Sequence, residues 1–289
     1  MKHAALTTLF LMLNTSALSS AKASDVSATA ASMLGHDTDS DVRVIGQSTE
    51  FGTTGRYANR AYNVALAAKL LDGAVILPGE VLSFNDRVGE RSSERGFLNA
   101  PVIANGRIRQ GLGGGVCQVS TTLHLAALTG GLEIVEHRTH SRTSSYADAG
   151  LDATVAWGTI DYKVRNPYDF PITVRAFAAD GVMRVELEGA ELPELEITTA
   201  KLRDLPVRDR IVVDESLAAG ERVVESEGRA GSVIRVMRIA EDGTREVFRE
   251  RYPSAPRVVR VGATSPMAGD ASDADAADVG DAADAADAA

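Results

Sequence analysis

The stretch GGGVCQVSTTLHLAAL, residues 113–128, joins three glycines to an apolar run with helical spacing and contains the only cysteine of the chain. Glycine adopts backbone conformations closed to other residues and allows a neighbouring segment or a ligand to approach closely. A helix that begins at Val116 or Cys117 places the thiol at the positive end of the helix dipole, which favours the thiolate. The pattern predicts either a nucleophilic cysteine or a cysteine packed behind a turn.

Around this helix, the sequence predicts an α+β domain over residues 42–190. Residues 53–73 repeat apolar side chains at intervals of three or four and end at Gly73, which indicates a second helix. Turn signals at Asn105-Gly106 and Asp180-Gly181 indicate hairpins. A few helices packed on an antiparallel sheet are therefore expected. The predicted strands lie within residues 74–84 (divided by a Pro-Gly turn), 101–109, 132–138, 153–158, 160–166 and 170–189.

A small all-β domain is predicted over residues 192–262. Apolar and polar residues alternate in RVVESEGRAGSVIRVMRIAEDGTREVFRERYP, residues 222–253, which indicates an antiparallel sheet with one wet face. The final segment, 263–289, is dominated by Asp and Ala and is predicted to be disordered. Its seven Asp residues account for most of the net charge of −10 and leave −3 on the rest of the chain. Nothing in this balance indicates a nucleic-acid partner.

The first residues predict export. Residues 1–23 combine a short basic start, a brief apolar run and a small-residue cleavage site, as in a signal peptide, and residues 24–41 read as a linker. A retained membrane anchor is the alternative. No later segment is apolar enough to span a bilayer, so the mature chain is expected to lack a transmembrane segment. The predicted location is periplasmic or extracellular, in association with the cell envelope.

A nucleophilic cysteine needs a base, and the histidines supply the candidates. His124 lies seven residues after Cys117, two helical turns and roughly 10 Å away, which is too far for contact. His140 follows a predicted strand and is the expected base, with Asp152 or Asp161 to orient its imidazole. For His140 and for both carboxylates, the alternative is a purely structural role. Because Cys117 and the histidines form no short-spaced ligand pair, neither a metal nor a cofactor is predicted.

Several residues near the glycines are candidates for substrate binding. Arg91 and Arg95 carry donors suited to a carboxylate or phosphate, although a solvated loop with local salt bridges is the alternative. The backbone N–H of Gln118 is a candidate oxyanion donor. The remaining candidates surround the cysteine and comprise Gly113, Gly114, Gly115, Ser120 and Thr121.

The sequence resembles the VanW family across residues 45–190. The resemblance rests on LDGAVILPGEVLSFNDRVGERSSERGF, APVIANGRIRQGLGGGVCQVSTTLHLAAL, EHRTHS and GLDATVAWGTIDYKVRN, in this order. It implies an exported, envelope-linked protein whose characteristic Cys, His and Asp positions correspond to Cys117, His140, Asp152 and Asp161. His124 departs from the pattern, because relatives often have Tyr there. The family name does not supply a molecular activity.

The small C-terminal unit is similar to a G-five domain. GRAGSVIRVMRIAEDGTREVF and SAPRVVRVG carry this resemblance, which implies a surface module proposed to bind amino-sugar glycans. A plain β spacer is the alternative.

Two functions therefore remain open from the sequence. The first is a cysteine-dependent acyl-transfer or amidase-type enzyme that acts on peptidoglycan peptide through Cys117 and His140. The second is a non-catalytic module that binds peptidoglycan or an envelope glycan, with Cys117 buried. Reactivity of the thiol distinguishes them, since an activated cysteine alkylates below pH 8 and a packed one resists.

Overall fold

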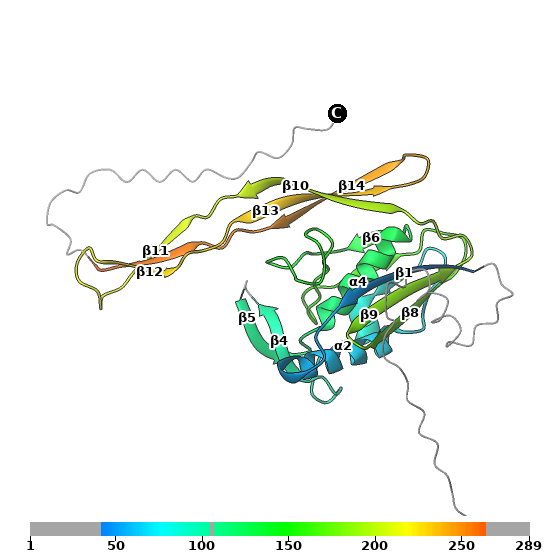
Figure 1. Cartoon of the computed structure of the whole chain (residues 1–289), viewed down its shortest axis with the longest axis horizontal. Helices are drawn as coiled ribbons and strands as arrows, with labels where there is room; N and C mark the ends of the chain where they lie inside the picture. Colours follow the sequence, from blue (N-terminus) through cyan, green and yellow to red (C-terminus); the bar gives the residue numbers. More distant parts are fainter. Residues whose placement is uncertain (1–41, 105–106, 264–289) are drawn as a thin grey trace, which may run out of the picture. The chain divides into compact units, whose positions relative to one another are not determined.

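The computed structural model describes residues 42–104 and 107–263. The predicted signal peptide (1–23), the linker (24–41), the Asn105-Gly106 turn and the acidic tail from residue 264 lie outside these described residues. Within them the predicted fold class is confirmed: a few helices pack on antiparallel sheets, and a small all-β region follows (Figure 1). No helix of the described part is long and apolar enough to cross a membrane.

The α+β region contains three α-helices, one short 3₁₀ helix and nine strands among its described residues. The helical elements are η1 (Gly55–Tyr57), α2 (Ala58–Leu71), α3 (Phe84–Val88) and α4 (Val116–Thr129). The strands are β1 (Arg43–Glu50), β2 (Ala74–Ile76), β3 (Val81–Ser83), β4 (Asn99–Ala104), β5 (Arg107–Leu112), β6 (Glu133–Glu136), β7 (Lys163–Arg165), β8 (Ile172–Ala179) and β9 (Val182–Gly189).

The central sheet has the order β1-β9-β8-β2, with every neighbouring pair antiparallel. Helix α4 packs against β9 and β1, and α2 packs against β8, so both helices cover this sheet (Figure 1). Almost all side chains of α4 are buried, because the helix also contacts α2 and β6. Six of the buried residues are polar, so the burial of this helix requires hydrogen-bond partners for their side chains. They are Gln118, Ser120, Thr121, Thr122, His124 and Thr129.

The glycines before α4 let the helix start approach two neighbouring segments. A Cβ on Gly114 would lie 2.6 Å from the carbonyl oxygen of Pro101 in β4. Gly115 has φ +111°, and a Cβ there would lie 2.9 Å from the carbonyl oxygen of Arg60 in α2. Residues with side chains do not fit these positions. The glycine loop therefore fixes the start of α4 against β4 and α2.

Two segments of the α+β region differ from the prediction. Residues 153–158 form no strand, and only a bridge between Ala156 and Ile160 is present there. The reason is that this segment bonds to α4 and to the histidine loop instead of to a neighbouring strand. Residues 84–88 form the short helix α3, which Ser83 caps through the backbone N–H of Asp86. A single helical turn leaves too little periodicity in the sequence to be recognised.

The C-terminal β region differs from the predicted single antiparallel sheet. It contains two three-stranded sheets, in the orders β10-β13-β14 and β11-β15-β12. Strands β11 and β15 run parallel, because long excursions of the chain separate them. The strands are β10 (Glu196–Leu205), β11 (Asp209–Val213), β12 (Arg222–Ser226), β13 (Gly231–Ile239), β14 (Arg245–Tyr252) and β15 (Arg257–Val261).

The close approach at Gly114 generates a prediction for stability. Gly114→Ala should lower the free energy of unfolding by about 1–3 kcal/mol, because backbone atoms of β4 must move to admit the methyl group. Gly46→Ala is the matched control, since its new methyl group would meet only the movable side chains of Arg184 and Glu186. Denaturant unfolding measures both variants. Equal stability of the two variants would contradict the packing described here.

Candidate active site

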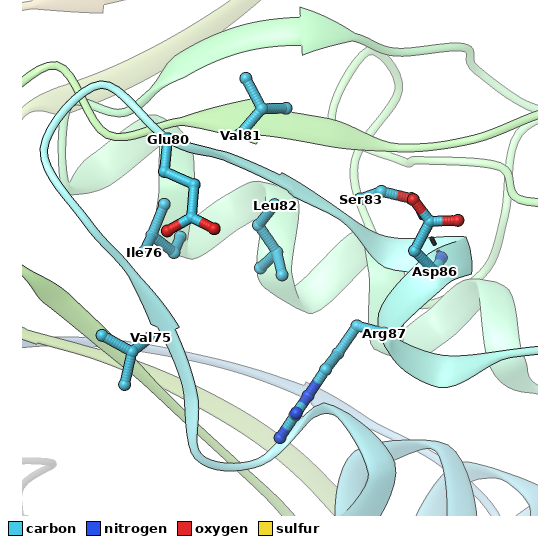
Figure 2. Close-up of a pocket in the computed structure, with 8 residues that line it drawn as sticks. All are labelled: Val75, Ile76, Glu80, Val81, Leu82, Ser83, Asp86 and Arg87. Atoms are coloured by element: carbon cyan, nitrogen blue, oxygen red, sulfur yellow. Dashed lines mark hydrogen bonds between the residues drawn. The ribbon is translucent and has the colours of Figure 1, made fainter.

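A cleft of about 1240 Å³ opens at the start of α4. Its walls include the glycine loop, Cys117, His140 and five arginines, Arg60, Arg91, Arg138, Arg142 and Arg251. A second, smaller pocket of about 290 Å³ lies between β2, β3 and α3, where Figure 2 shows Glu80 and Arg87 among its lining residues. That pocket contains neither a cysteine nor a histidine. The large cleft therefore contains the candidate catalytic residues Cys117 and His140.

Cys117 lies in the first turn of α4 and is half-buried on the wall of the cleft. Its thiol donates a hydrogen bond to the carbonyl oxygen of Val155 at 3.4 Å. Burial alone raises the pKa of the thiol, but the hydrogen bond and positive charge of His140, with a contribution from Arg91, outweigh burial. The pKa of Cys117 therefore lies below its ordinary value, and the thiolate is favoured.

His140 lies between Cys117 and Asp152. Its ring atom Nδ1 is 2.5 Å from Oδ2 of Asp152, and its backbone N–H donates to the same oxygen at 2.8 Å. Burial lowers the pKa of His140, but the hydrogen bonds to Asp152 and Cys117 outweigh burial and raise the pKa to about 10. A raised imidazole pKa beside a lowered thiol pKa favours a thiolate–imidazolium pair at neutral pH.

The carboxylate of Asp152 is itself almost fully buried. Burial raises its pKa, but hydrogen bonds from His140 and from Tyr252 outweigh burial and hold the pKa below its ordinary value. The side chain therefore remains ionised beside the imidazole. Charge-assisted hydrogen bonds of this kind are about twice as strong as neutral ones.

Asp161 does not orient the imidazole, contrary to one of the two expected arrangements. Its carboxylate accepts hydrogen bonds from the hydroxyl of Ser83 at 2.5 Å and from the backbone N–H of Asn85 at 2.9 Å. These contacts tie β3 and the start of α3 to the segment before β7. Asp161 is a structural residue in this arrangement, and Asp152 alone contacts His140.

Ser120 and Thr121 are also corrected, because neither side chain reaches the cleft. Both are fully buried, and both donate to the carbonyl oxygen of Ala153, at 2.8 and 3.4 Å. The backbone N–H of Ala153 in turn donates to the hydroxyl of Thr121 at 3.0 Å. These bonds attach the residue after Asp152 to α4. The two hydroxyls therefore fix the position of the Asp152 carboxylate and do not contact a substrate.

The two candidate arginines occupy different places. Arg91 lines the cleft, donates through Nη1 to the carbonyl oxygen of Gly89 at 2.8 Å, and has its pKa lowered by burial to about 10. Arg95 is exposed, donates to the carbonyl oxygen of Val88 at 3.0 Å and does not line the cleft. Nothing in the sequence around Arg91 and Arg95 indicates that only Arg91 lines the cleft.

Gln118 lines the cleft together with Gly113, Gly114 and Gly115, but its hydrogen-bonding groups are already used. Its backbone N–H donates to the carbonyl oxygen of Gly115 at 2.9 Å, so it is not a free oxyanion donor as expected. Its side-chain oxygen accepts from Arg60 at 2.7 Å, and its amide donates to Thr49 and to the backbone of Glu50. Gln118 therefore positions Arg60 at the cleft.

His124 and His137 pair with each other. The rings of His124 and His137 stack at 4.2 Å, and Nδ1 of His124 lies 3.1 Å from the hydroxyl of Tyr162. Burial holds the pKa of His124 well below its ordinary value, so this ring is neutral. Among the described residues, no three His, Cys, Asp or Glu side chains are arranged to hold a metal ion.

Three residues of the site were not predicted. Arg60 reaches the cleft from α2, and Tyr146 lies beneath its guanidinium, whose central carbon is 5.7 Å from the ring centroid. Tyr252 reaches Asp152 from β14. Each residue stands far from Cys117 in sequence, and no local motif marks any of them. Only the fold brings them to the site.

Comparison with known proteins identifies the two parts of the chain. Residues 59–188 match the family described as "VanW like protein", and residues 196–264 match the G5 domain. The chain therefore contains a VanW-like domain followed by a G5 domain, as the sequence resemblance predicted. The solved G5 domain of an IgA1 protease is similar at 23% identity, covering 26% of this chain and 96% of that chain with a TM-score of 0.20.

Two curated relatives are similar to the chain. The uncharacterized protein YoaR of Bacillus subtilis is 39% identical over 148 residues, which is 51% of this chain and 47% of the relative. The vancomycin B-type resistance protein VanW of Enterococcus faecalis is 36% identical over 116 residues, which is 38% of this chain and 42% of the relative. The matches span about half the length of each relative or less.

The paired pKa shifts predict how Cys117 reacts with pH. The alkylation rate with iodoacetamide at pH 7 should be about tenfold higher in the folded protein than in urea, because the unfolded thiol is mostly protonated there. As the pH falls through the lowered pKa of Cys117, the rate should drop. A folded protein that reacts only near pH 9, or not at all, would contradict the pair.

Replacement of the two aspartates separates orientation from structure. Asp152→Asn should lower the alkylation rate at pH 7 by about tenfold, because the amide removes the charge that supports the His140 imidazolium. Asp161→Asn, the matched control, should leave that rate unchanged and affect only stability. Similar alkylation rates in both variants would refute the assignment of Asp152.

Proposed function

We propose that the protein is an exported cell-envelope enzyme that performs cysteine-dependent acyl transfer or amide hydrolysis on the peptide of peptidoglycan. The observation that carries the proposal is the arrangement of Cys117, His140 and Asp152 at the cleft. His140 is hydrogen-bonded to Asp152, and its positive charge helps to lower the pKa of Cys117. A nucleophile, a base and a carboxylate that orients the base, in this order, are the parts that covalent catalysis requires.

The reaction begins with the thiolate of Cys117. Its sulfur bonds to the carbonyl carbon of a substrate amide, and the carbonyl electron pair moves to oxygen. The His140 imidazolium gives its proton to the leaving amine as the C–N bond breaks, which leaves a thioester and a neutral imidazole. Incoming water or amine then loses a proton to His140 and attacks the thioester. The thiolate departs, and the thiolate–imidazolium pair is restored.

The negative oxygen formed during this step needs hydrogen-bond donors. Because the N–H of Gln118 is used within the helix start, we assign the backbone N–H of Cys117 itself to the oxyanion. This group lies in the first turn of α4, where the helix dipole is positive. Preorganised donors at this position stabilise developing charge without reorganisation.

The arginines of the cleft support an acidic substrate. Nη2 of Arg91 is buried and has no hydrogen-bond partner among the described residues, although Nη1 is bonded. An unpaired guanidinium N–H favours a ligand that brings an acceptor, and a carboxylate fits its geometry. Arg60 is another positive charge on the same cleft. The carboxylates of a wall peptide satisfy both groups.

Envelope location is supported by the family assignment and by the predicted signal peptide. The G5 match over residues 196–264 favours a second candidate function, in which the protein binds wall glycan without catalysis. In that case the cleft is a binding groove and the thiol is not a nucleophile. Both functions place the protein at peptidoglycan, and they differ in whether a covalent bond changes.

Digestion of purified peptidoglycan tests the enzyme directly. Wild-type protein should alter the muropeptide profile, and Cys117→Ala should abolish the change, because the attacking sulfur is gone. Arg95→Ala is the control and should act as the wild type does, since Arg95 lies outside the cleft. Identical profiles from wild type and Cys117→Ala would reject the enzyme, and cosedimentation of both with the wall would then support the binding function.

A further inference from the structure

The G5 region contributes a side chain to the candidate active site. Tyr252, the last residue of β14, is almost fully buried, and its hydroxyl donates to Oδ1 of Asp152. The same hydroxyl accepts a hydrogen bond from the backbone N–H of Gly150 at 2.6 Å. His140 occupies Oδ2 of the carboxylate. Both carboxylate oxygens of Asp152 are therefore hydrogen-bonded, Oδ2 to His140 of the α+β region and Oδ1 to Tyr252 of the G5 region.

Neighbouring residues of β14 hold the segment that carries the histidines. The carboxylate of Glu250 lies 3.4 Å from Nδ1 of His137, and the carbonyl oxygen of Arg251 accepts from Thr139 at 3.3 Å. His137 in turn places its Nε2 2.9 Å from the carbonyl oxygen of Asp152. Residues 250–252 thus contact the segment that leads into His140 and the aspartate that orients it.

Packing from β13 reinforces these contacts. Ile234 and Val236 form a small buried cluster with Tyr252 and with Leu128 of α4. They lie so close to Gly150 that a Cβ there would be 2.8 Å from Val236 and 2.9 Å from Ile234. The position of Tyr252 relative to Asp152 is therefore set by apolar packing as well as by its hydrogen bonds.

We propose that Tyr252 is a positioning residue for the Cys117–His140 pair, so that the G5 region completes the site in addition to any binding role. This inference rests on the proposed function. The phenol holds the Asp152 carboxylate in the orientation that receives His140 and draws negative charge toward Oδ1. Without this donor, the ionised form of the buried carboxylate loses a hydrogen bond and the pKa of Asp152 rises. The charge that supports the His140 imidazolium is then weaker, which disfavours the thiolate.

The hydroxyl is what separates this role from simple packing. A phenylalanine at 252 would preserve the apolar contacts with Ile234 and Val236, because the ring is unchanged. It would remove the donor to Asp152 and the acceptor for Gly150. A structural role alone needs only the ring, whereas a positioning role needs the oxygen.

Tyr252→Phe tests the proposal in the full-length protein, with iodoacetamide as the probe of Cys117. We expect its alkylation rate at pH 7 to fall by about tenfold, and the midpoint of its pH profile to move upward, because a hydrogen bond to a charged group is lost. Tyr168→Phe is the matched control. It removes a hydroxyl that donates to the carbonyl oxygen of Gly130 at 3.0 Å and does not line the cleft, so its pH profile should equal that of the wild type.

The outcomes distinguish the two proposals. If wild-type Cys117 is unreactive at pH 7, the proposed function fails. If wild-type Cys117 is reactive and Tyr252→Phe has the same pH profile, the positioning role of Tyr252 is overturned. Should Tyr252→Phe not fold, tyrosine labelled with ¹³C at Cζ in the wild type provides the test. Burial and the neighbouring Asp152 carboxylate raise the pKa of Tyr252, so its ¹³C signal should remain that of the protonated phenol through the pH range in which an exposed tyrosine titrates. Titration near the ordinary value of 10.0 overturns the proposal.

Discussion

The buried carboxylate of Asp152 is the group on which the candidate site depends. It is almost inaccessible to water, and a buried charge is unfavourable unless hydrogen bonds and an opposite charge compensate for it. His140 and Tyr252 supply these bonds, and the imidazolium supplies the charge. The thiolate of Cys117 then has a cation beside it. Loss of any one of these partners weakens the others, because they share one small volume of low polarity.

The surrounding fold serves to place this carboxylate beside the thiol. The glycines at 113–115 allow the start of α4 to touch β4 and α2, which fixes Cys117 on the wall of the cleft. Ser120 lies three residues further along the same helix. Its hydroxyl and that of Thr121 both donate hydrogen bonds to the carbonyl oxygen of Ala153. One helix thus carries the sulfur on one turn and anchors the residue after Asp152 on the next. The distance between nucleophile and carboxylate is a consequence of helical geometry.

Much of this arrangement could be predicted from the sequence, where local pattern decides. The glycine run and the apolar period marked the start of α4 and the place of Cys117, and the histidine segment supplied His140 as the expected base. The choice between Asp152 and Asp161 could not be made, since both lie in short segments with similar surroundings. Only contacts with Ser83 and Asn85 reveal that Asp161 is structural.

Other features depend on contacts between distant segments and left no local signal. Tyr252 lies 100 residues beyond Asp152, in an alternating strand where any aromatic residue would fit the pattern. The parallel pairing of β11 with β15 is likewise set by tertiary packing, because strand direction is not encoded in alternation. Ser120 and Thr121 looked like polar neighbours of a nucleophile, yet helix packing turns both toward the core.

The ionisation state of the single cysteine is the most direct test of the account. Thiolate absorbs ultraviolet light more strongly than thiol, so the difference between wild type and Cys117→Ala across a pH titration reports this one group. We predict thiolate absorbance that develops below the ordinary pKa of 9.0, with ¹⁵N shifts of His140 showing both ring nitrogens protonated up to a pKa of about 10. Thiolate absorbance that appears only near the ordinary pKa of 9.0, beside a neutral His140 at pH 7, would contradict it.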